Sequence, residues 1–278
     1  MIELQLDRVA RAFDLPQGGT YCVLDGISLD LEAGAFVAIV GPSGCGKSTL
    51  LNVAAGLLVP TSGRVIAGSA ELAGLNRRAT YLFQQDALLP WKNVRDNVTL
   101  GLTLAGVGRT EACRRADAWL ARVGLTTFAA HYPAQLSGGM RKRVAMAQHW
   151  IIDRELLLMD EPFSALDVHT RQRMESELLG LWERSERSAD RVAGHDRKTV
   201  LFVTHDLEEA ITLADEVVVL SAGPASRIVA RHPVTLDRPR DVMELRTTPA
   251  FIDLYRTVWG VLRSEVVKSQ MNAEVRRG

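Results

Sequence analysis

The chain has 278 residues, 47% of them hydrophobic and 24% charged, and these are the proportions of an ordinary globular protein. Lys plus Arg and Asp plus Glu number 33 each, so no overall field draws the chain to nucleic acid or anionic lipid. The best apolar stretch, residues 50–59, is shorter than the roughly 20 residues that span a bilayer. Three scattered cysteines and an N-terminus without a signal-peptide pattern indicate a reducing compartment, most simply the cytosol.

The first predicted elements in chain order are two half-buried strands and one fully buried strand. Residues 2–9 and 23–31 alternate apolar and polar side chains, a pattern typical of antiparallel strands with one wet face. Residues 35–40 are continuously apolar, as in a parallel strand that is covered on both faces. A Gly-rich loop follows, and helical propensity resumes at residues 47–55. Strand, loop and helix in this order are the setting of a phosphate-binding loop.

The Gly-rich loop matches the pattern G-x-x-x-x-G-K-[ST] at every fixed position. Its glycines allow a tight turn, so that successive N–H groups point at phosphate, and the next helix begins there. We expect Lys47 to reach the β- and γ-phosphates of ATP and the Ser48 hydroxyl to ligate Mg²⁺. A chance match is the alternative, and the flanking strand and helix disfavour it. The nucleotide-binding residues predicted here are Gly41, Pro42, Ser43, Gly44, Cys45, Gly46, Lys47, Ser48 and Thr49.

Helical patterns fill the middle of the chain, between more strands. They run through residues 84–150, with residues 110–123 the clearest, so we expect a helical insertion in an α/β core. Apolar runs at residues 156–159 and 199–204 predict two further central strands. The charged segment 185–198 between them is predicted to be a surface excursion or a mobile loop.

Two carboxylates close the strand predicted at residues 156–159. We expect Asp160 near the metal, through water, and the adjacent Glu161 in position to polarise the water that attacks ATP. A strand that ends in Asp-Glu is by itself commonplace and usually means a solvated strand end. Together with the phosphate-binding loop, the pair predicts a nucleoside triphosphatase that uses ATP and Mg²⁺.

A short motif before these carboxylates resembles the signature motif of the ABC ATPases. Leu136-Ser137-Gly138-Gly139 stands between the phosphate-binding loop and the Asp-Glu pair, in the family's order. In that family the Ser and both glycines touch nucleotide phosphate, so the resemblance assigns nucleotide contacts to Ser137, Gly138 and Gly139. Met140 stands where the family usually has Gln, and this departure affects only a secondary polar contact.

Other motifs of the family follow in the same order. Gln84 resembles the glutamine that meets Mg²⁺ and senses the membrane partner, and Asp167 resembles the aspartate that crosses the dimer interface. His205 resembles the switch histidine that contacts the γ-phosphate, although a lone His at a strand end is more often structural. Phe13 resembles the aromatic that stacks on adenine; Tyr21 is the alternative, and simple packing is an interpretation of either. The expected participants in hydrolysis are Lys47, Gln84, Glu161 and His205, and those around Mg²⁺ are Ser48, Gln84 and Asp160.

The resemblance implies a fold and a division into domains. The fold is α/β, a P-loop NTPase with a RecA-like core, an antiparallel β subdomain and an inserted helical subdomain at about residues 85–150. The ATPase domain would cover residues 1–235. Residues 236–278, which show an amphipathic pattern at 249–267, would form a C-terminal helical extension.

The resemblance also implies partners. The phosphate-binding loop and the signature motif each offer an anion-binding surface, so two copies would sandwich ATP head to tail, most simply as a homodimer. Transmembrane permease subunits would be the direct partners and a solute-binding protein an indirect one. The chain would then work at the cytoplasmic face of the cell membrane, held there by the permease.

One stretch narrows the resemblance to a class of importers. Residues 88–91, Leu-Leu-Pro-Trp, look like the ATPase subunits of importers for nitrate, sulfonates and taurine, and residues 238–242 point the same way. Trp91 either packs inside the helical subdomain or anchors the permease. Two departures from the family are Gln-His-Trp at residues 148–150, after the signature helix, and the lengthened connection at residues 185–198.

Other functions are alternatives to this interpretation. The nearest is an ABC ATPase of another transporter class, for a different solute or for export. A nucleic-acid-associated ABC ATPase usually carries a long coiled-coil insertion or two fused cores, and the neutral charge gives no phosphate-backbone footprint, so we expect no nucleic acid partner. A nucleotide-dependent scaffold without hydrolysis is disfavoured by Glu161 and His205.

Overall fold

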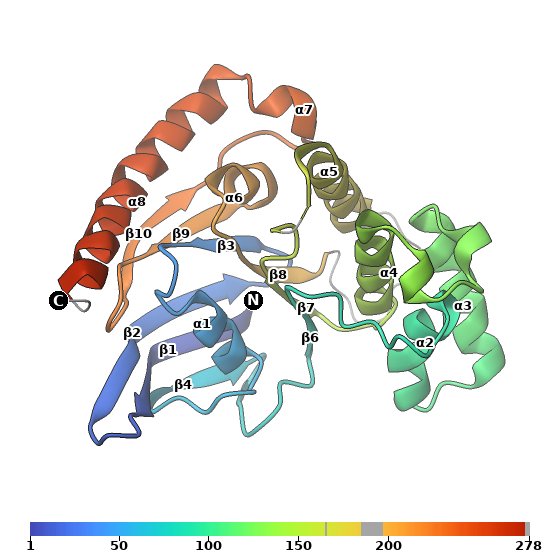
Figure 1. Cartoon of the computed structure of the whole chain (residues 1–278), viewed down its shortest axis with the longest axis horizontal. Helices are drawn as coiled ribbons and strands as arrows, with labels where there is room; N and C mark the ends of the chain where they lie inside the picture. The colour runs from blue at the N-terminus through green and yellow to red at the C-terminus, as the bar shows by residue number, and fades with distance from the viewer. Residues whose placement is uncertain (165, 185–196, 276–278) are drawn as a thin grey trace.

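The computed structural model describes residues 1–164, 166–184 and 197–275, and Figure 1 shows how two β-sheets and the helices are arranged. The central sheet has six strands, in the spatial order β10 (Ile228–Pro233), β9 (Glu216–Leu220), β3 (Phe36–Val40), β8 (Thr199–Val203), β7 (Leu156–Asp160) and β6 (Ala79–Leu82). The second sheet has four, in the order β2 (Thr20–Glu32), β1 (Ile2–Asp14), β4 (Ser62–Ala67) and β5 (Ala70–Glu71).

Helices connect the strands and cover the central sheet. In chain order they are α1 (Lys47–Ala54), α2 (Val94–Leu104), α3 (Arg109–Arg122), the 3₁₀ turns η1 (Thr126–Phe128) and η2 (Pro133–Gln135), α4 (Gly138–Trp150), α5 (Val168–Arg184), α6 (Leu207–Leu213), α7 (Val242–Leu245) and α8 (Pro249–Val275). No helix in the described part of the chain combines the length and the apolar character needed to cross a membrane.

The central sheet is parallel except for the edge strand β10, which pairs antiparallel with β9. Successive side chains of a strand point to opposite faces, and both faces of this sheet are covered. Along β3, Phe36, Ala38 and Val40 enter one hydrophobic core, while Val37 and Ile39 enter the other. This double burial explains the continuous apolar run in the sequence. The predicted α/β fold, with a buried parallel sheet and an antiparallel β-sheet, is confirmed.

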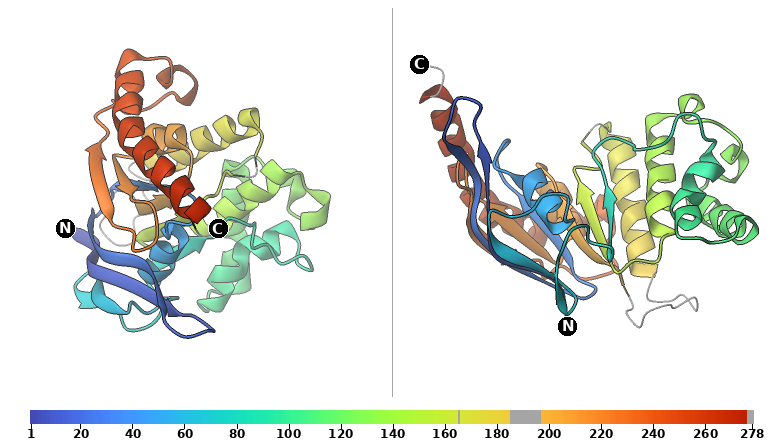
Figure 2. Two further views of the ribbon diagram at one scale, coloured as in Figure 1. Left: turned by 60° about the vertical axis from the view of Figure 1, so that its left-hand side comes forward. Right: turned by 90° about the horizontal axis from the view of Figure 1, so that it is seen from below.

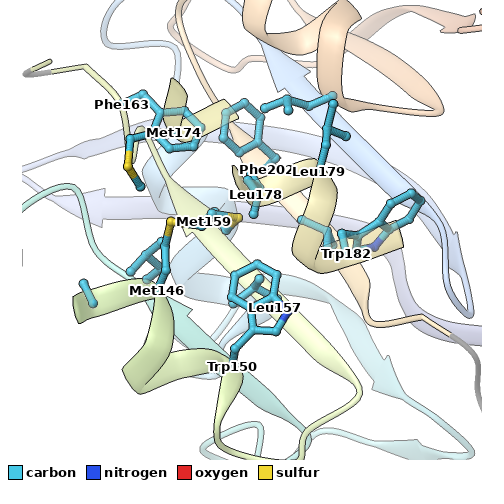
Figure 3. Packing of buried hydrophobic residues seen from close by; sticks show 14 of the residues in the cluster. Met146, Trp150, Leu157, Met159, Phe163, Met174, Leu178, Leu179, Trp182 and Phe202 are labelled. Atoms are coloured by element: carbon cyan, nitrogen blue, oxygen red, sulfur yellow. The ribbon is translucent and has the colours of Figure 1, made fainter. Parts of the chain in front are cut away.

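The two cores lie on opposite sides of the central sheet. One holds α1 between the central sheet and the antiparallel sheet, and the other joins the central sheet to α4, α5, α6 and α8 (Figure 2). In Figure 3, Trp182 of α5 and Phe202 of β8 occupy the second core. The ring centres of Phe36 and Trp182 lie 5.5 Å apart there, in an edge-to-face arrangement. Trp150 is also buried there, so the last residue of the unusual Gln-His-Trp sequence is accommodated by packing.

The structure differs from the sequence prediction in the middle of the chain. Residues 84–93 form a loop, and helix begins only at Val94 after the N-cap Asn93, whose side chain accepts a hydrogen bond from the Asp96 N–H. The buried Asn97 side chain exchanges hydrogen bonds with both backbone groups of Leu89, which holds this loop against α2. The charged segment predicted as a surface excursion, at residues 185–198, falls mostly outside the described residues, since 185–196 are not among them.

The C-terminal helices pack on one of the two hydrophobic cores that the first 235 residues form. Val242, Phe251, Val258 and Leu262 belong to the core that contains α5 and α6, and α8 runs along the outside of β9 and β10 (Figure 1). Helix α8 continues to residue 275, beyond the amphipathic stretch predicted at 249–267. The domain boundary at residue 235 stays a prediction.

A buried ion pair fastens this region to α5. The Arg246 Nη2 donates to Glu175 Oε2 at 2.7 Å, and the Glu175 side chain is fully buried. Burial raises the pKa of Glu175 to about 7, and the neighbouring Arg246 limits the rise. The guanidinium therefore favours the charged form of a carboxyl group whose burial disfavours it.

We predict that Arg246→Ala destabilises the fold, and more so at high pH. The folded-state pKa of Glu175 lies above its value in an unfolded chain. The stability that this group contributes to the fold is therefore lost as pH rises through the folded-state pKa. Without Arg246 that pKa rises further, and the loss continues at pH values where the parent has stopped losing stability. Urea unfolding should show a loss of ~3 kcal/mol near pH ~8.5 and less near pH ~6. Arg256→Ala, at an exposed position of α8, is the control; equal losses at both pH values would contradict this account.

Candidate functional site

The residues predicted to take part in hydrolysis and Mg²⁺ binding gather where four parallel strands end. The phosphate-binding loop follows β3, Gln84 follows β6, Asp160 ends β7, and His205 follows β8. These strands are neighbours in one parallel sheet, so their carboxyl ends meet at one edge, which is where α/β folds bind ligands. Residues that are far apart in the sequence are thereby brought to a single site.

The phosphate-binding loop wraps around its own lysine. The buried Lys47 Nζ donates to the carbonyl oxygens of Gly41 at 2.9 Å and Pro42 at 3.2 Å. Gly46 is the N-cap of α1 with φ 96°, and no side chain caps the helix. The first N–H groups of α1 therefore remain available to an anion at the positive end of the helix.

Glycine is required at two points of this loop for different reasons. A Cβ on Gly46 would lie 2.7 Å from Val23 Cγ1, so β2 leaves no room for a side chain. Gly44 has φ 76° and open space around it, so only its backbone conformation favours glycine. Cys45 is buried beside Gly41 and β9, and burial raises the pKa of its thiol. Cys45 thus serves packing in this loop.

Asp160 is held by two hydroxyl groups. Its Oδ1 accepts from the Ser48 Oγ at 3.0 Å, and its Oδ2 accepts from the Tyr81 hydroxyl at 3.2 Å. Burial raises the pKa of Asp160, and both hydrogen bonds oppose the rise. Tyr81 is not among the site residues predicted from the sequence. Strand alternation could have indicated this residue. Tyr81 lies on β6 two residues after Ala79, and both side chains are on the face that packs on the core containing α1.

Glu161 and His205 form a pair beside Asp160. The His205 Nδ1 lies 2.9 Å from Glu161 Oε2, and a carboxylate can only accept in this hydrogen bond. Glu161 has φ 42°, an uncommon backbone conformation for a residue with a side chain. The Ser164 Oγ donates to the Glu161 carbonyl at 3.0 Å and accepts from Gln84 Nε2 at 3.3 Å. Gln84, Glu161 and His205 are thus linked in one chain of contacts.

A buried lysine, also missed in the sequence, anchors the Gln84 loop. The Lys142 Nζ of α4 donates to the Gln84 carbonyl at 2.7 Å and lies 2.9 Å from Asp86 Oδ1. Its side chain is almost wholly buried, so the ion pair compensates the charge. Helix α4, which begins at the signature motif, is therefore tied to the loop after β6.

The signature and Asp167 lie beside one another, and their hydrogen bonds are local. The Ser137 hydroxyl caps α4 by accepting from the Met140 N–H, and a Cβ on Gly139 would lie 2.9 Å from Thr170 Cγ2 of α5. Asp167 is exposed, and its Oδ1 accepts from the Thr170 N–H, which lowers the pKa of its carboxyl. These residues adjoin the start of α5, whereas the phosphate-binding loop adjoins β2 and β9.

The two aromatic candidates for adenine face each other across a strand pair. Phe13 of β1 and Tyr21 of β2 are partners in the antiparallel register. The Arg11 guanidinium lies 4.5 Å from the Phe13 ring centre. Tyr21 is two residues from Val23, which lies next to Gly46 of the phosphate-binding loop, and Phe13 is the register partner of Tyr21, so both remain candidates.

The sequence matches the family model described as ABC transporter over residues 24–164. The chain belongs to the ABC transporter family. It is 41% identical to the taurine import ATP-binding protein of Rhizobium johnstonii, over 94% of this chain and 97% of that protein. It is 38% identical to a nitrate import ATP-binding protein of Synechococcus elongatus, over 90% of this chain and 88% of that protein.

A solved structure of an ATP-binding cassette resembles most of this chain. It is the dimeric, post-hydrolysis state of an ATP-binding cassette bound to ADP and phosphate, with a TM-score of 0.69 and 29% identity. The match covers 84% of this chain and 100% of the cassette. This chain is therefore the ATP-binding, ATP-hydrolysing subunit of an ABC transporter.

The loop geometry of this ABC ATPase predicts different effects of two similar substitutions. Gly46→Ala adds a methyl group that meets Val23, so it should destabilise the fold by ~3 kcal/mol or more and abolish binding of a fluorescent ATP analogue. Gly44→Ala is the matched control, with a positive φ but no close neighbour, and should destabilise by ~1 kcal/mol. Urea unfolding measures both; equal losses would contradict the contact with β2.

Proposed function

We propose that this ABC ATPase drives the import of a small anion such as nitrate, a sulfonate or taurine, from the cytoplasmic face of the cell membrane. The substrate class rests on sequence identity over at least 90% of the chain. This identity is 41% with a protein named for taurine import and 38% with one named for nitrate import. The Leu-Leu-Pro-Trp stretch at residues 88–91 is the second support. The proposed ATPase domain is residues 1–235, with a helical subdomain at about 85–150 and an extension at 236–278.

Hydrolysis is proposed to follow from the groups at the strand ends. Glu161 accepts a proton from the attacking water, and His205, 2.9 Å from its carboxylate, contacts the γ-phosphate. When ATP binds, Lys47 leaves its two carbonyl acceptors in the loop and donates to phosphate oxygens. Its positive charge then stabilises the negative charge that develops on these oxygens during hydrolysis. Gln84, joined to Ser164, links this site to the loop that leads into the helical subdomain.

The donor atoms of this site fit Mg²⁺. Ser48 and Asp160 supply a hydroxyl and a carboxylate oxygen that already lie 3.0 Å apart, and Gln84 supplies an amide oxygen. Mg²⁺ prefers oxygen ligands and is usually held by one or two carboxylates together with water and substrate phosphate. Bound here, it would neutralise charge on the phosphates. Among the described residues there is no cluster of three or more His, Cys, Asp or Glu side chains that could hold a metal ion.

The active form is proposed to be a homodimer. Ser137, Gly138 and Gly139 lie at the N-terminal end of α4, beside the start of α5 and the exposed Asp167. In a head-to-tail pair, this end of α4 supplies the second anion-binding surface for the γ-phosphate of the partner's ATP. The similar cassette was solved as a dimer bound to ADP and phosphate. Nucleotide would also contact the phosphate-binding loop and one aromatic, Phe13 or Tyr21.

The membrane partner is proposed to dock beside Trp91. This side chain is 71% exposed, so it does not pack in the core, and Leu88, three residues earlier, is buried. A large exposed aromatic on a loop fixed by Asn97 is a suitable interface anchor. Permease subunits would bind here, and a solute-binding protein would act through them.

Glu161→Gln should bind ATP normally but lose at least ~100-fold in kcat, because the amide has the shape of the carboxylate and cannot accept the proton. ATP should then hold the variant as a stable dimer, which size-exclusion chromatography detects. Lys47→Ala is the contrasting variant and should lose ATP affinity itself. Turnover by Glu161→Gln at the parental rate would show that Glu161 is not the base.

Transport in cells tests the partner and the substrate together. A strain that lacks this chain should lose uptake of labelled nitrate, taurine or an alkanesulfonate, and the parent gene should restore it. Trp91→Ala should fail to restore uptake or to co-purify the permease, while the purified variant keeps its ATPase rate. Leu104→Ala, at the far end of α2 and 80% exposed, is the control and should restore uptake. Normal uptake of all three solutes without the chain would refute the substrate class.

A further inference from the structure

Arg171, in the first turn of α5, touches two loops of the site that the proposed mechanism treats separately. Its Nη2 donates to the Leu166 carbonyl at 3.3 Å, next to Asp167. Its Nη1 donates to Asp206 Oδ2 at 2.9 Å, next to His205. Helices α5 and α6 are in contact at this place and appear as neighbours in Figure 1. One guanidinium therefore bridges the Asp167 turn and the His205 loop.

The His205 loop has further buried support on the same side. The Thr204 Oγ1 donates to Glu209 Oε2 at 2.6 Å and accepts from the Asp206 N–H at 3.0 Å. Glu209 is buried, and its Oε1 lies 3.5 Å from the Arg171 Nε. The cation thus reaches both carboxylates of this cluster, Asp206 and Glu209, from α5.

His205 itself has little to hold it. Among the described residues, its side chain makes one hydrogen bond, to Glu161, and it is exposed. Its position is therefore set by its neighbours in the chain, Thr204 and Asp206, which are the two residues tied into the cluster around Arg171. A shift of the Asp167 turn would pull on Arg171 and so on the segment that carries His205.

We propose that Arg171 is a positioning residue for ATP hydrolysis, which couples the placement of the Asp167 turn to the placement of His205 against Glu161. The proposal rests on the proposed function, in which Asp167 lies at the subunit contact and His205 and Glu161 act on ATP. Formation of the dimer then sets the hydrolytic pair through a contact within one subunit. Arg171 touches neither nucleotide nor water in this role.

The geometry requires the forked guanidinium. The Asp206 carboxylate is reached by Nη1 and the Leu166 carbonyl by Nη2, and the one nitrogen of a lysine ammonium cannot occupy both of these positions in the planar fork. Arg171→Lys keeps the positive charge next to Glu209 and so limits the loss of stability. Arg173→Lys is the matched control, because Arg173 lies on the same helix, is 70% exposed and pairs only with Glu177 in the salt bridges described.

Steady-state ATPase kinetics of the purified chain test the proposal. Arg171→Lys should lower kcat by about tenfold and leave the KM for ATP within about twofold of the parent, because it disturbs the reacting arrangement and not nucleotide binding. Asp206→Asn should do the same: asparagine still caps α6, as Asp206 does through Oδ1, but it no longer pairs with Arg171. The double variant should be no slower than the slower single variant, since both remove one connection.

Several results would overturn the proposal. These are a parental kcat in Arg171→Lys, a rise in KM with unchanged kcat, effects of the two variants that multiply, or a loss as large in Arg173→Lys. If neither variant folds, Arg171 is a stability element and the coupling role is wrong. Failure of the proposed function is recognised by a different result. It appears as parental turnover in Glu161→Gln, whatever the kinetics of Arg171→Lys and Asp206→Asn.

Discussion

The nucleotide site depends on one constraint, which is that β3, β6, β7 and β8 are buried parallel strands whose carboxyl ends meet at a single edge. Parallel strands need crossover connections, so each strand leads into a loop at that edge and most loops lead into a helix. Helix α1 begins there with uncapped N–H groups. The same geometry that satisfies the backbone of the sheet therefore collects phosphate-binding amides, carboxylates and a histidine in one place.

Charged groups behind this edge are buried, and each is paired. Lys47 turns to two loop carbonyls, Lys142 to Asp86 and the Gln84 carbonyl, and Glu175 to Arg246. An unpaired charge in such surroundings would be strongly unfavourable. Pairing has a mechanical consequence, because Lys142 joins the Gln84 loop to α4 and Arg171 joins the His205 loop to α5. Helices α4 and α5 thereby connect the site to the helical insertion and to the proposed subunit contact.

The fold was largely predictable from sequence, and the site only partly. Apolar runs identified β3, β7 and β8 to within a residue because strands buried on both faces leave no polar alternation. The helical patterns predicted through residues 84–150 gave no helix start, and the structure places it at Val94. The pattern does not show that Asn97 holds the loop before it through Leu89. Tyr81 and Lys142 were missed because neither belongs to a motif; each matters through a partner far away in the chain.

By itself, the sequence determined the strand–loop–helix of the phosphate-binding loop, the order of the motifs and hence the family, because these depend on local spacing and backbone requirements. Tertiary structure alone decided which groups meet. It exposed Trp91, buried Trp150, set Phe13 opposite Tyr21, and brought Arg171 between the Asp167 turn and the His205 loop. The contact of Arg171 with Asp206 joins residues 35 positions apart, and a pattern of nearest neighbours along the chain carries no information about such contacts. Only the packing of helices on the central sheet fixes them.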